Sequence, residues 1–181
     1  ASMVGDGGAN YEEPFETCVD ALINYKKPLI AAVDGTAIGG GATILLHFDA
    51  IFISPNAKVK YPFSDLGLAP EVGSSLLLFQ SLGYQKAAQV LFGAEWISGK
   101  EYFDFGMAKY LGEDYYDKAI DYAHQLNEQS LASIIETKAI LKSFNADALS
   151  KARDLETKAM KRLYGSEDNI KAIEKFFSRK L

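Results

Sequence analysis

The sequence contains very little cysteine and histidine. Its 181 residues include one cysteine, Cys18, and two histidines, His47 and His124. A single cysteine excludes a disulfide within the chain and favours a reducing compartment. The two histidines lie far apart in the sequence with no neighbouring cysteine cluster, so we expect no metal site.

Long apolar runs and clusters of positive charge are also missing. No run reaches the roughly 18 apolar residues that a membrane helix needs, so we expect no membrane span. The net charge is −5 and no run of Lys and Arg stands out, which argues against nucleic-acid binding. The opening ASMVGDGGANYEE lacks the basic head and apolar middle of a signal peptide. It also lacks a starting methionine, so we expect that the chain begins inside a larger protein.

The remaining composition is that of a chain able to fold around a core. Apolar residues make up 48% and charged residues 24%, which are ordinary values for a globular protein. A length of 181 residues fits one domain better than two small ones.

Strand and helix signals alternate in the first part of the chain. Helical spacing of apolar residues predicts a helix over 11–25. The segments PLIAAVDG, DAIFIS and AKVKY read as short buried or alternating strands. Between the first two, three glycines in AIGGGATILLHF predict a turn that leads into a helix.

Helices dominate the rest. We expect one from Val72 to about Leu82, ended by Gly83, then a second in YQKAAQVLFG, and an N-cap at Ser98. From residue 115 onward four successive helical patterns occur without strand signals. The prediction is therefore an α/β fold in which 1–114 form a strand and helix core and 115–181 a helical region of the same domain.

The glycine turn AIGGG, Ala37 to Gly41, is the first candidate site. Glycines let a ligand approach the backbone closely, and free N–H groups at a helix start attract a phosphate or an oxyanion. The spacing fits neither the phosphate loop nor the dinucleotide fingerprint. A plain strand-to-helix turn explains the same residues.

Glu71, in LGLAPEVGSS, is the second candidate. An acidic residue in the first turn of a helix stabilises it by roughly 0.3–1 kcal/mol through the helix dipole, which is one explanation. The other explanation is a general base. The helix start lowers the pKa of such a carboxyl and burial raises it, and a base that works near neutral pH needs the two effects nearly balanced.

The segment KPLIAAVDGTAIGGGATILLHFDAIFISPNAKVKYPFSDLGLAPEVGSSLLL resembles the crotonase (enoyl-CoA hydratase/isomerase) superfamily. LFGAEWISGKEYFDFGMAKYL and the closing SEDNIKAIEKFFSRK extend the resemblance over essentially the whole chain. It implies a fold of repeated strand-strand-helix turns followed by a helical region. It also implies that the N-terminal part of the fold, which supplies one of two oxyanion-hole N–H groups, should precede Ala1.

The resemblance implies roles for particular residues. Hydratases of the family carry two glutamates where this chain has Thr43 and Phe63, whereas Glu71 falls where peroxisomal-type 3,2-enoyl-CoA isomerases carry their single catalytic glutamate. Gly40 would supply an oxyanion-hole N–H. The resemblance further implies a set of substrate-binding residues: Ala37, Ile38, Gly39, Phe63, Leu66, Leu68 and Phe176. Phe63, Leu66 and Leu68 can equally be core residues.

Several expectations about the whole protein follow from the resemblance. The substrate would be an acyl-CoA thioester, with no cofactor beyond its coenzyme A, and the protein would be a homo-oligomer, a trimer or a dimer of trimers. The compartment would be the cytoplasm in a bacterium, and the peroxisome or mitochondrial matrix in a eukaryote. Two alternatives remain open: another acyl-CoA enzyme of the family, such as a hydratase or dienoyl-CoA isomerase, and a non-catalytic binding module.

Overall fold

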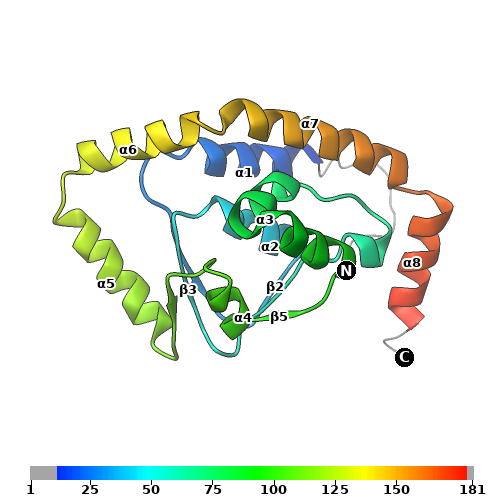
Figure 1. The fold of residues 1–181 in the computed structure, drawn as a ribbon, viewed down its shortest axis with the longest axis horizontal. Helices are drawn as coiled ribbons and strands as arrows, with labels where there is room; N and C mark the ends of the chain where they lie inside the picture. The colour runs from blue at the N-terminus through cyan, green and yellow to red at the C-terminus, as the bar shows by residue number, and fades with distance from the viewer. Residues whose placement is uncertain (1–11, 179–181) are drawn as a thin grey trace.

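The computed structural model describes residues 12–178, and its elements alternate between short strands and helices before a run of helices (Figure 1). The first part contains α1 (Glu12–Asn24), β1 (Ile30–Val33), β2 (Thr36–Ile38), α2 (Gly40–Thr43), the 3-10 turn η1 (Ile44–His47), β3 (Ala50–Ile53), β4 (Lys58–Lys60) and the 3-10 turn η2 (Ser64–Leu66). The second part contains α3 (Ser74–Gly93), β5 (Ile97–Ser98), α4 (Gly99–Asp104), β6 (Tyr110–Leu111), α5 (Tyr115–Asn127), α6 (Leu131–Ser143), α7 (Ala146–Leu163) and α8 (Glu167–Ser178).

Two three-stranded sheets form the centre of the fold. In the first, β3 lies between β1 and β6 and pairs with both in parallel, with Ile30 opposite Ala50 and Phe52 opposite Tyr110. In the second, β4 pairs in parallel with β2 and antiparallel with β5. All four residues of β3 are buried, which matches a strand with neighbours on both sides and explains its continuous apolar sequence.

The three predicted strands are confirmed, whereas β2, β5 and β6 were not predicted. Each of these has only two or three residues, which is too short for an alternation pattern to stand out. The predicted helix over 11–25 is observed as α1 from residue 12, and its first predicted residue lies outside the described part of the chain.

The prediction that a helix begins at Val72 is wrong. α3 begins at Ser74, because Val72 and Gly73 have left-handed φ angles of 62° and 78° and cannot continue a right-handed helix. The predicted break at Gly83 is confirmed: its φ of 73° and ψ of 166° are not helical and separate two helical segments, which together form the kinked element α3. Ser98 caps α4 as predicted, in a full capping box with Glu101.

The four C-terminal helices wrap around the rest of the chain. Figure 1 shows α6 and α7 arching over one side, with α1 beneath α7, and α5 and α8 at opposite ends. Arg153 on α7 forms ion pairs with Glu16 and Asp20 on α1, at 2.6 and 2.8 Å. Lys138 on α6 donates to Asp49 Oδ2 at 2.6 Å, beside the start of β3. These contacts hold the helical region against the core.

No helix in the described part of the chain is long and apolar enough to cross a membrane.

Candidate functional site

Gly40 lies at the junction of β2 and α2. The preceding residue, Gly39, has φ 55° and ψ −122°, a conformation that glycine adopts without steric cost, and its N–H donates to Lys60 O at 3.1 Å. This bond ties the glycine turn to β4. Gly40 then begins α2, and the first N–H groups of a helix have no partner within it. The turn therefore presents backbone donors at a fixed place.

Glu71 reaches this glycine turn from a different part of the chain. A Cβ built on Gly40 would lie 3.6 Å from Glu71 Oε1 and 3.4 Å from the Phe15 ring. The structure thus brings together the two predicted catalytic residues, which are separated by β3 and β4. Phe15, on α1, was not predicted as a site residue, because nothing in its own segment indicates which part of the core α1 covers.

The pKa of the Glu71 carboxyl is raised above its usual 4.5, first by burial and then by the negative charges of Glu156 and Glu16. A helix start would lower the pKa of Glu71 through the helix dipole. This effect is weak here, because Glu71 lies three residues before α3 rather than in its first turn. The helix-dipole explanation of this residue is therefore not supported. A raised pKa brings a carboxylate nearer to the range in which a general base works.

The two residues after Glu71 are conformationally unusual. Val72 has φ 62°, which is rare for a β-branched residue and costs on the order of 1–3 kcal/mol. Gly73 follows with φ 78°, and a Cβ there would meet Leu149 Cδ1 on α7. The chain reverses direction over these two residues. A conformation of this kind persists only where surrounding contacts maintain it.

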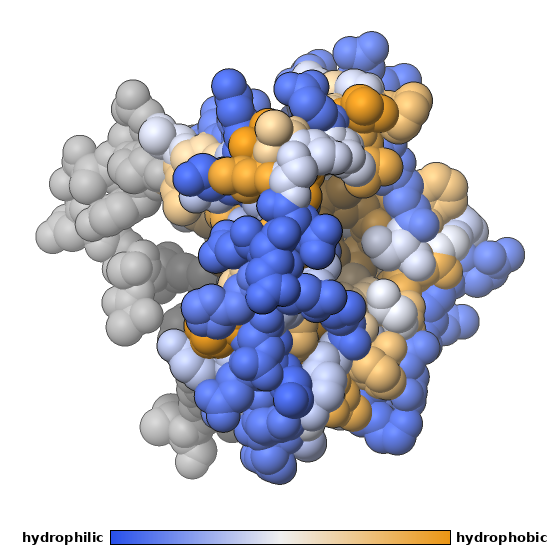
Figure 2. All heavy atoms as spheres, turned by 90° about the vertical axis from the view of Figure 1, so that its left-hand side faces the viewer, coloured by the Kyte–Doolittle hydropathy of each residue, from blue (hydrophilic) through white to orange (hydrophobic). Residues whose placement is uncertain are grey.

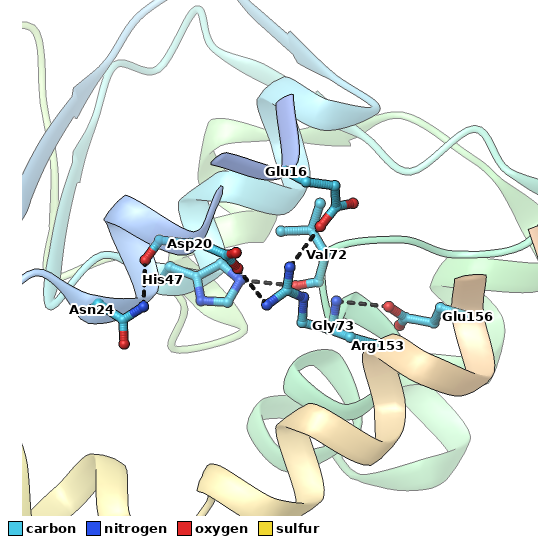
Figure 3. Close-up of polar contacts among 8 residues, drawn as sticks. All are labelled: Glu16, Asp20, Asn24, His47, Val72, Gly73, Arg153 and Glu156. Atoms are coloured by element: carbon cyan, nitrogen blue, oxygen red, sulfur yellow. Dashed lines mark hydrogen bonds and ion pairs between the residues drawn. The ribbon is translucent and has the colours of Figure 1, made fainter. Parts of the chain in front are cut away.

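Residues from η1 and α7 hold this turn, and their bonds to Val72 and Gly73 are drawn in Figure 3. Glu156, on α7, accepts the Gly73 N–H at 2.7 Å and the Ser75 N–H at 2.8 Å. His47 Nε2, at the end of η1, lies 2.8 Å from Val72 O. Burial lowers the pKa of His47, and because a carbonyl oxygen only accepts, the Nε2–H of the ring donates to Val72 O.

Sequence reasoning missed Glu156. The sequence does carry a signal for it: the apolar residues Leu149, Ala152 and Met160 of α7 recur at helical spacing, and the structure shows that they lie on the less exposed face. Glu156 falls on this stripe and is only 5% exposed. A carboxylate on the buried face of an amphipathic helix needs a hydrogen-bonding or charged partner, so such a position in a sequence indicates a buried polar contact.

The other predicted substrate-binding residues lie in different environments. Ala37 and Ile38 belong to β2, and Ile38 is 42% exposed. Phe63 is 4% exposed and packs in the main core cluster, which fits the alternative that it is a core residue. Phe176, on α8, is 43% exposed.

Leu66 and Leu68 are half-buried next to α8. Asn169 Nδ2 on α8 donates to Leu66 O at 2.6 Å, and a Cβ on the intervening Gly67 would lie 3.0 Å from the Asn169 backbone. Only a glycine allows α8 to approach the segment this closely. The segment that carries the two leucines is therefore held in place by the last helix.

The two positions at which hydratases of the family carry glutamates hold side chains without acid-base capacity. Thr43 is fully buried, and its hydroxyl donates to Gly40 O at 3.1 Å. Phe63 is buried in the core. Neither position supplies the carboxylate near Gly40, which comes from Glu71.

A cavity of about 1010 Å³ lies beside the candidate site, between α1, η1 and helices α5 to α7. Glu16, His47 and Arg153 line it, but Gly40 and Glu71 do not. Figure 2, which looks at the molecule from the α5 side, shows a hydrophilic band with a hollowed, hydrophobic area next to it. The cavity and the candidate site are neighbours that share the surroundings of His47.

Within residues 12–178 no three metal-ligating side chains of His, Cys, Asp or Glu gather in one place.

Comparison with known proteins relates this arrangement to a family. The chain is 29% identical over 168 residues to enoyl-CoA delta isomerase 2 of Rattus norvegicus, covering 90% of this chain and 42% of the relative. It is 26% identical over 168 residues to the Chromodomain Y-like protein of Mus musculus, covering 90% of this chain and 28% of that protein. The chain thus spans less than half the length of these two curated relatives.

The fold is similar to that of solved structures. The structure of Pseudomonas aeruginosa OdaA superposes with a TM-score of 0.82 at 35% identity, covering 87% of this chain and 65% of OdaA. Residues 3–180 match the family described as enoyl-CoA hydratase/isomerase, over nearly the whole chain. On both sequence and fold, the chain belongs to the enoyl-CoA hydratase/isomerase family.

Proposed function

We propose that the protein is a 3,2-enoyl-CoA isomerase, which moves the double bond of a 3-enoyl-CoA to the 2-trans position. One observation carries the proposal: the Glu71 carboxylate lies 3.6 Å from the Cβ position of Gly40, with no second acid at the positions of Thr43 and Phe63. Isomerisation requires one group that removes and returns a proton, whereas hydration also requires groups that position and activate water.

In the proposed reaction the thioester oxygen accepts the Gly40 N–H. Glu71 removes a proton from C2, and the electron pair delocalises over C2, C3 and C4 and the thioester oxygen. Backbone N–H donors stabilise the resulting enolate oxygen, an effect whose loss typically costs about 10²–10³ in rate per donor. Protonated Glu71 then returns the proton to C4, which leaves the double bond between C2 and C3.

The raised pKa of Glu71 supports this role. A carboxyl that takes a proton from carbon and gives it back works best when its two protonation states are close in energy. Burial and the nearby Glu156 and Glu16 shift the Glu71 carboxyl in that direction. The match with enoyl-CoA delta isomerase 2 is consistent with the same assignment.

The test compares two substrates and two variants of the full-length protein. Wild type should convert 3-hexenoyl-CoA faster than it hydrates crotonyl-CoA, and Glu71→Gln should abolish the isomerisation. Glu95→Gln, which removes an exposed carboxylate from a loop, serves as the control and should retain wild-type activity. Equal rates for wild type and Glu71→Gln would show that another group moves the proton. Faster hydration would favour the hydratase alternative, and no turnover at all would favour a binding module.

We also propose that the protein assembles into a homo-oligomer, in line with the trimers of the family. α6 exposes apolar side chains that a monomer would leave in water, among them Ile140 at 56% and Leu141 at 65%. Phe144, at the end of the same helix, is 78% exposed. Light scattering coupled to size-exclusion chromatography of the full-length protein should give a mass of three or six chains, and a monomer would contradict the proposal.

A further inference from the structure

Glu156 makes more contacts with the Glu71 turn than a helix cap requires. Its Oε2 accepts the Gly73 N–H at 2.7 Å, while its Oε1 accepts both the Ser75 N–H at 2.8 Å and the Ser75 hydroxyl at 2.5 Å. Both carboxylate oxygens are thus engaged, and charge-assisted bonds of this kind are short and directional. The residue is 5% exposed, so water does not compete for these donors.

The geometry of these bonds fixes the backbone that carries Glu71. Gly73 is the residue at which the left-handed turn ends, and Ser75 lies in the first turn of α3. A carboxylate that holds both N–H groups fixes where the turn stands relative to the helix. The Ser74 N–H adds a bond to Glu71 O at 3.0 Å, which links the catalytic candidate directly to the same segment.

The turn is also held from its other side. His47 donates to Val72 O, so the Val72 carbonyl and the Gly73 N–H are bonded in opposite directions by groups from η1 and α7 (Figure 3). η1 follows directly after α2, which carries Gly40. The support of the turn therefore connects the glycine donor, the carboxylate and α7.

We propose that Glu156 is a positioning residue of the isomerase, which holds the turn at Val72 and Gly73 so that the Glu71 carboxylate stays beside Gly40. The inference rests on the proposed function, in which Glu71 moves the proton. A proton that travels between two carbons requires the carboxylate to face both, and small displacements of a reacting group reduce the rate strongly. A local cap would have been sufficient to stabilise α3 alone.

Glu156→Gln in the full-length protein tests the proposal. An amide presents one acceptor oxygen in place of two, so either the Gly73 or the Ser75 N–H loses its partner while the side-chain volume is kept. We expect kcat for 3-hexenoyl-CoA to fall on the order of 10-fold to 100-fold with KM nearly unchanged. Asp154→Asn, which removes an exposed carboxylate from the same helix, is the matched control and should keep wild-type kinetics.

Two further measurements separate positioning from simple stabilisation. Amide hydrogen exchange, read by mass spectrometry on peptides covering residues 70–78, should be faster in Glu156→Gln and unchanged in Asp154→Asn. The acidic limb of the pH–rate profile should move to lower pH, because the pKa of Glu71 is raised in part by the charge of Glu156, with Glu16 on α1 as the other contributing carboxylate. Ser75→Ala, which removes only the hydroxyl bond, should lower kcat less.

The outcomes are distinct. Faster exchange with unchanged kcat would make Glu156 merely structural and overturn the proposal, as would a slower reaction with unchanged exchange. If Glu156→Gln does not fold, Ser75→Ala carries the test, and kcat equal to wild type in that variant would count against positioning. If wild type isomerises no 3-enoyl-CoA, the proposed function fails by itself, while the exchange difference still shows whether Glu156 holds the turn.

Discussion

Replacing Gly40 by alanine should change stability and activity in opposite directions. The new methyl group would lie 3.4 Å from the Phe15 ring and 3.6 Å from Glu71 Oε1, which are ordinary contact distances. The φ of Gly40 is not left-handed, so alanine fits the backbone. Removing the conformational freedom of a glycine in the unfolded chain should then raise the free energy of unfolding by about 0.4–1 kcal/mol.

The same methyl group should block the reaction. The substrate carbon must come within roughly 3–3.5 Å of the carboxylate to lose its proton. A methyl group 3.6 Å from Glu71 Oε1 occupies that space. In the proposed reaction it would also crowd the thioester oxygen that accepts the Gly40 N–H. Loss of one oxyanion donor alone corresponds to about 10²–10³ in kcat, so we expect a decrease of at least this size.

Gly41→Ala provides the control. Gly41 is the next residue of α2, is exposed, and has nothing within 4 Å of its Cβ position. It should show a similar gain in stability with wild-type turnover. The assays are urea unfolding followed by circular dichroism and the conversion of 3-hexenoyl-CoA. Turnover of Gly40→Ala within about threefold of wild type would refute the reasoning, because the space beside Glu71 would then not be where the substrate reacts.

Three further predictions concern the stability of the same region, measured by urea unfolding. The Ser74 hydroxyl is buried without a hydrogen-bond partner among the described residues, so Ser74→Ala should be neutral or stabilising by about 1 kcal/mol; a clear loss of stability would indicate a missed partner. Gly73→Ala should destabilise by about 2–4 kcal/mol, because alanine is strained at φ 78° and its methyl would overlap Leu149; a stable variant would contradict the left-handed turn. Glu71→Gln should be more stable than wild type at pH 7, because a carboxyl whose pKa is raised in the folded state loses its stabilising contribution as pH rises through that pKa. This difference should shrink below pH 4.5, and an equal difference at every pH would show that the charge of Glu71 is not the cause.

The sequence predicts most of the longer elements of this fold. The strands at β1 and β3 follow from short continuous apolar runs, the four C-terminal helices from helical sequence patterns without strand signals, and the cap at Ser98 from side-chain chemistry. The beginning of α3 does not follow, since Val72 is an unusual residue for a left-handed conformation and the bonds that hold it come from elsewhere in the chain. Local propensity cannot reveal a conformation that tertiary contacts maintain.

The candidate site was predictable only in part. Gly40 and Glu71 follow from the family resemblance, and the structure places them in proximity. Phe15 and Glu156 complete their surroundings from α1 and α7, at positions that no short motif connects to the glycine turn. Such partners emerge only when distant segments are brought together in space.

The hydrogen bond between Gly73 and Glu156 has a consequence for the order in which the protein becomes functional during synthesis. The two residues are 83 positions apart, so at roughly 5–20 residues per second the ribosome needs about 4–17 s to add Glu156 after Gly73. During this interval the nascent chain already contains the glycine turn and Glu71 but not the carboxylate that binds the Gly73 amide. If the proposed roles of Glu71 and Glu156 hold, full activity is acquired late in translation, and a stalled or prematurely terminated chain that lacks α7 carries both candidate catalytic residues without the carboxylate that holds their turn.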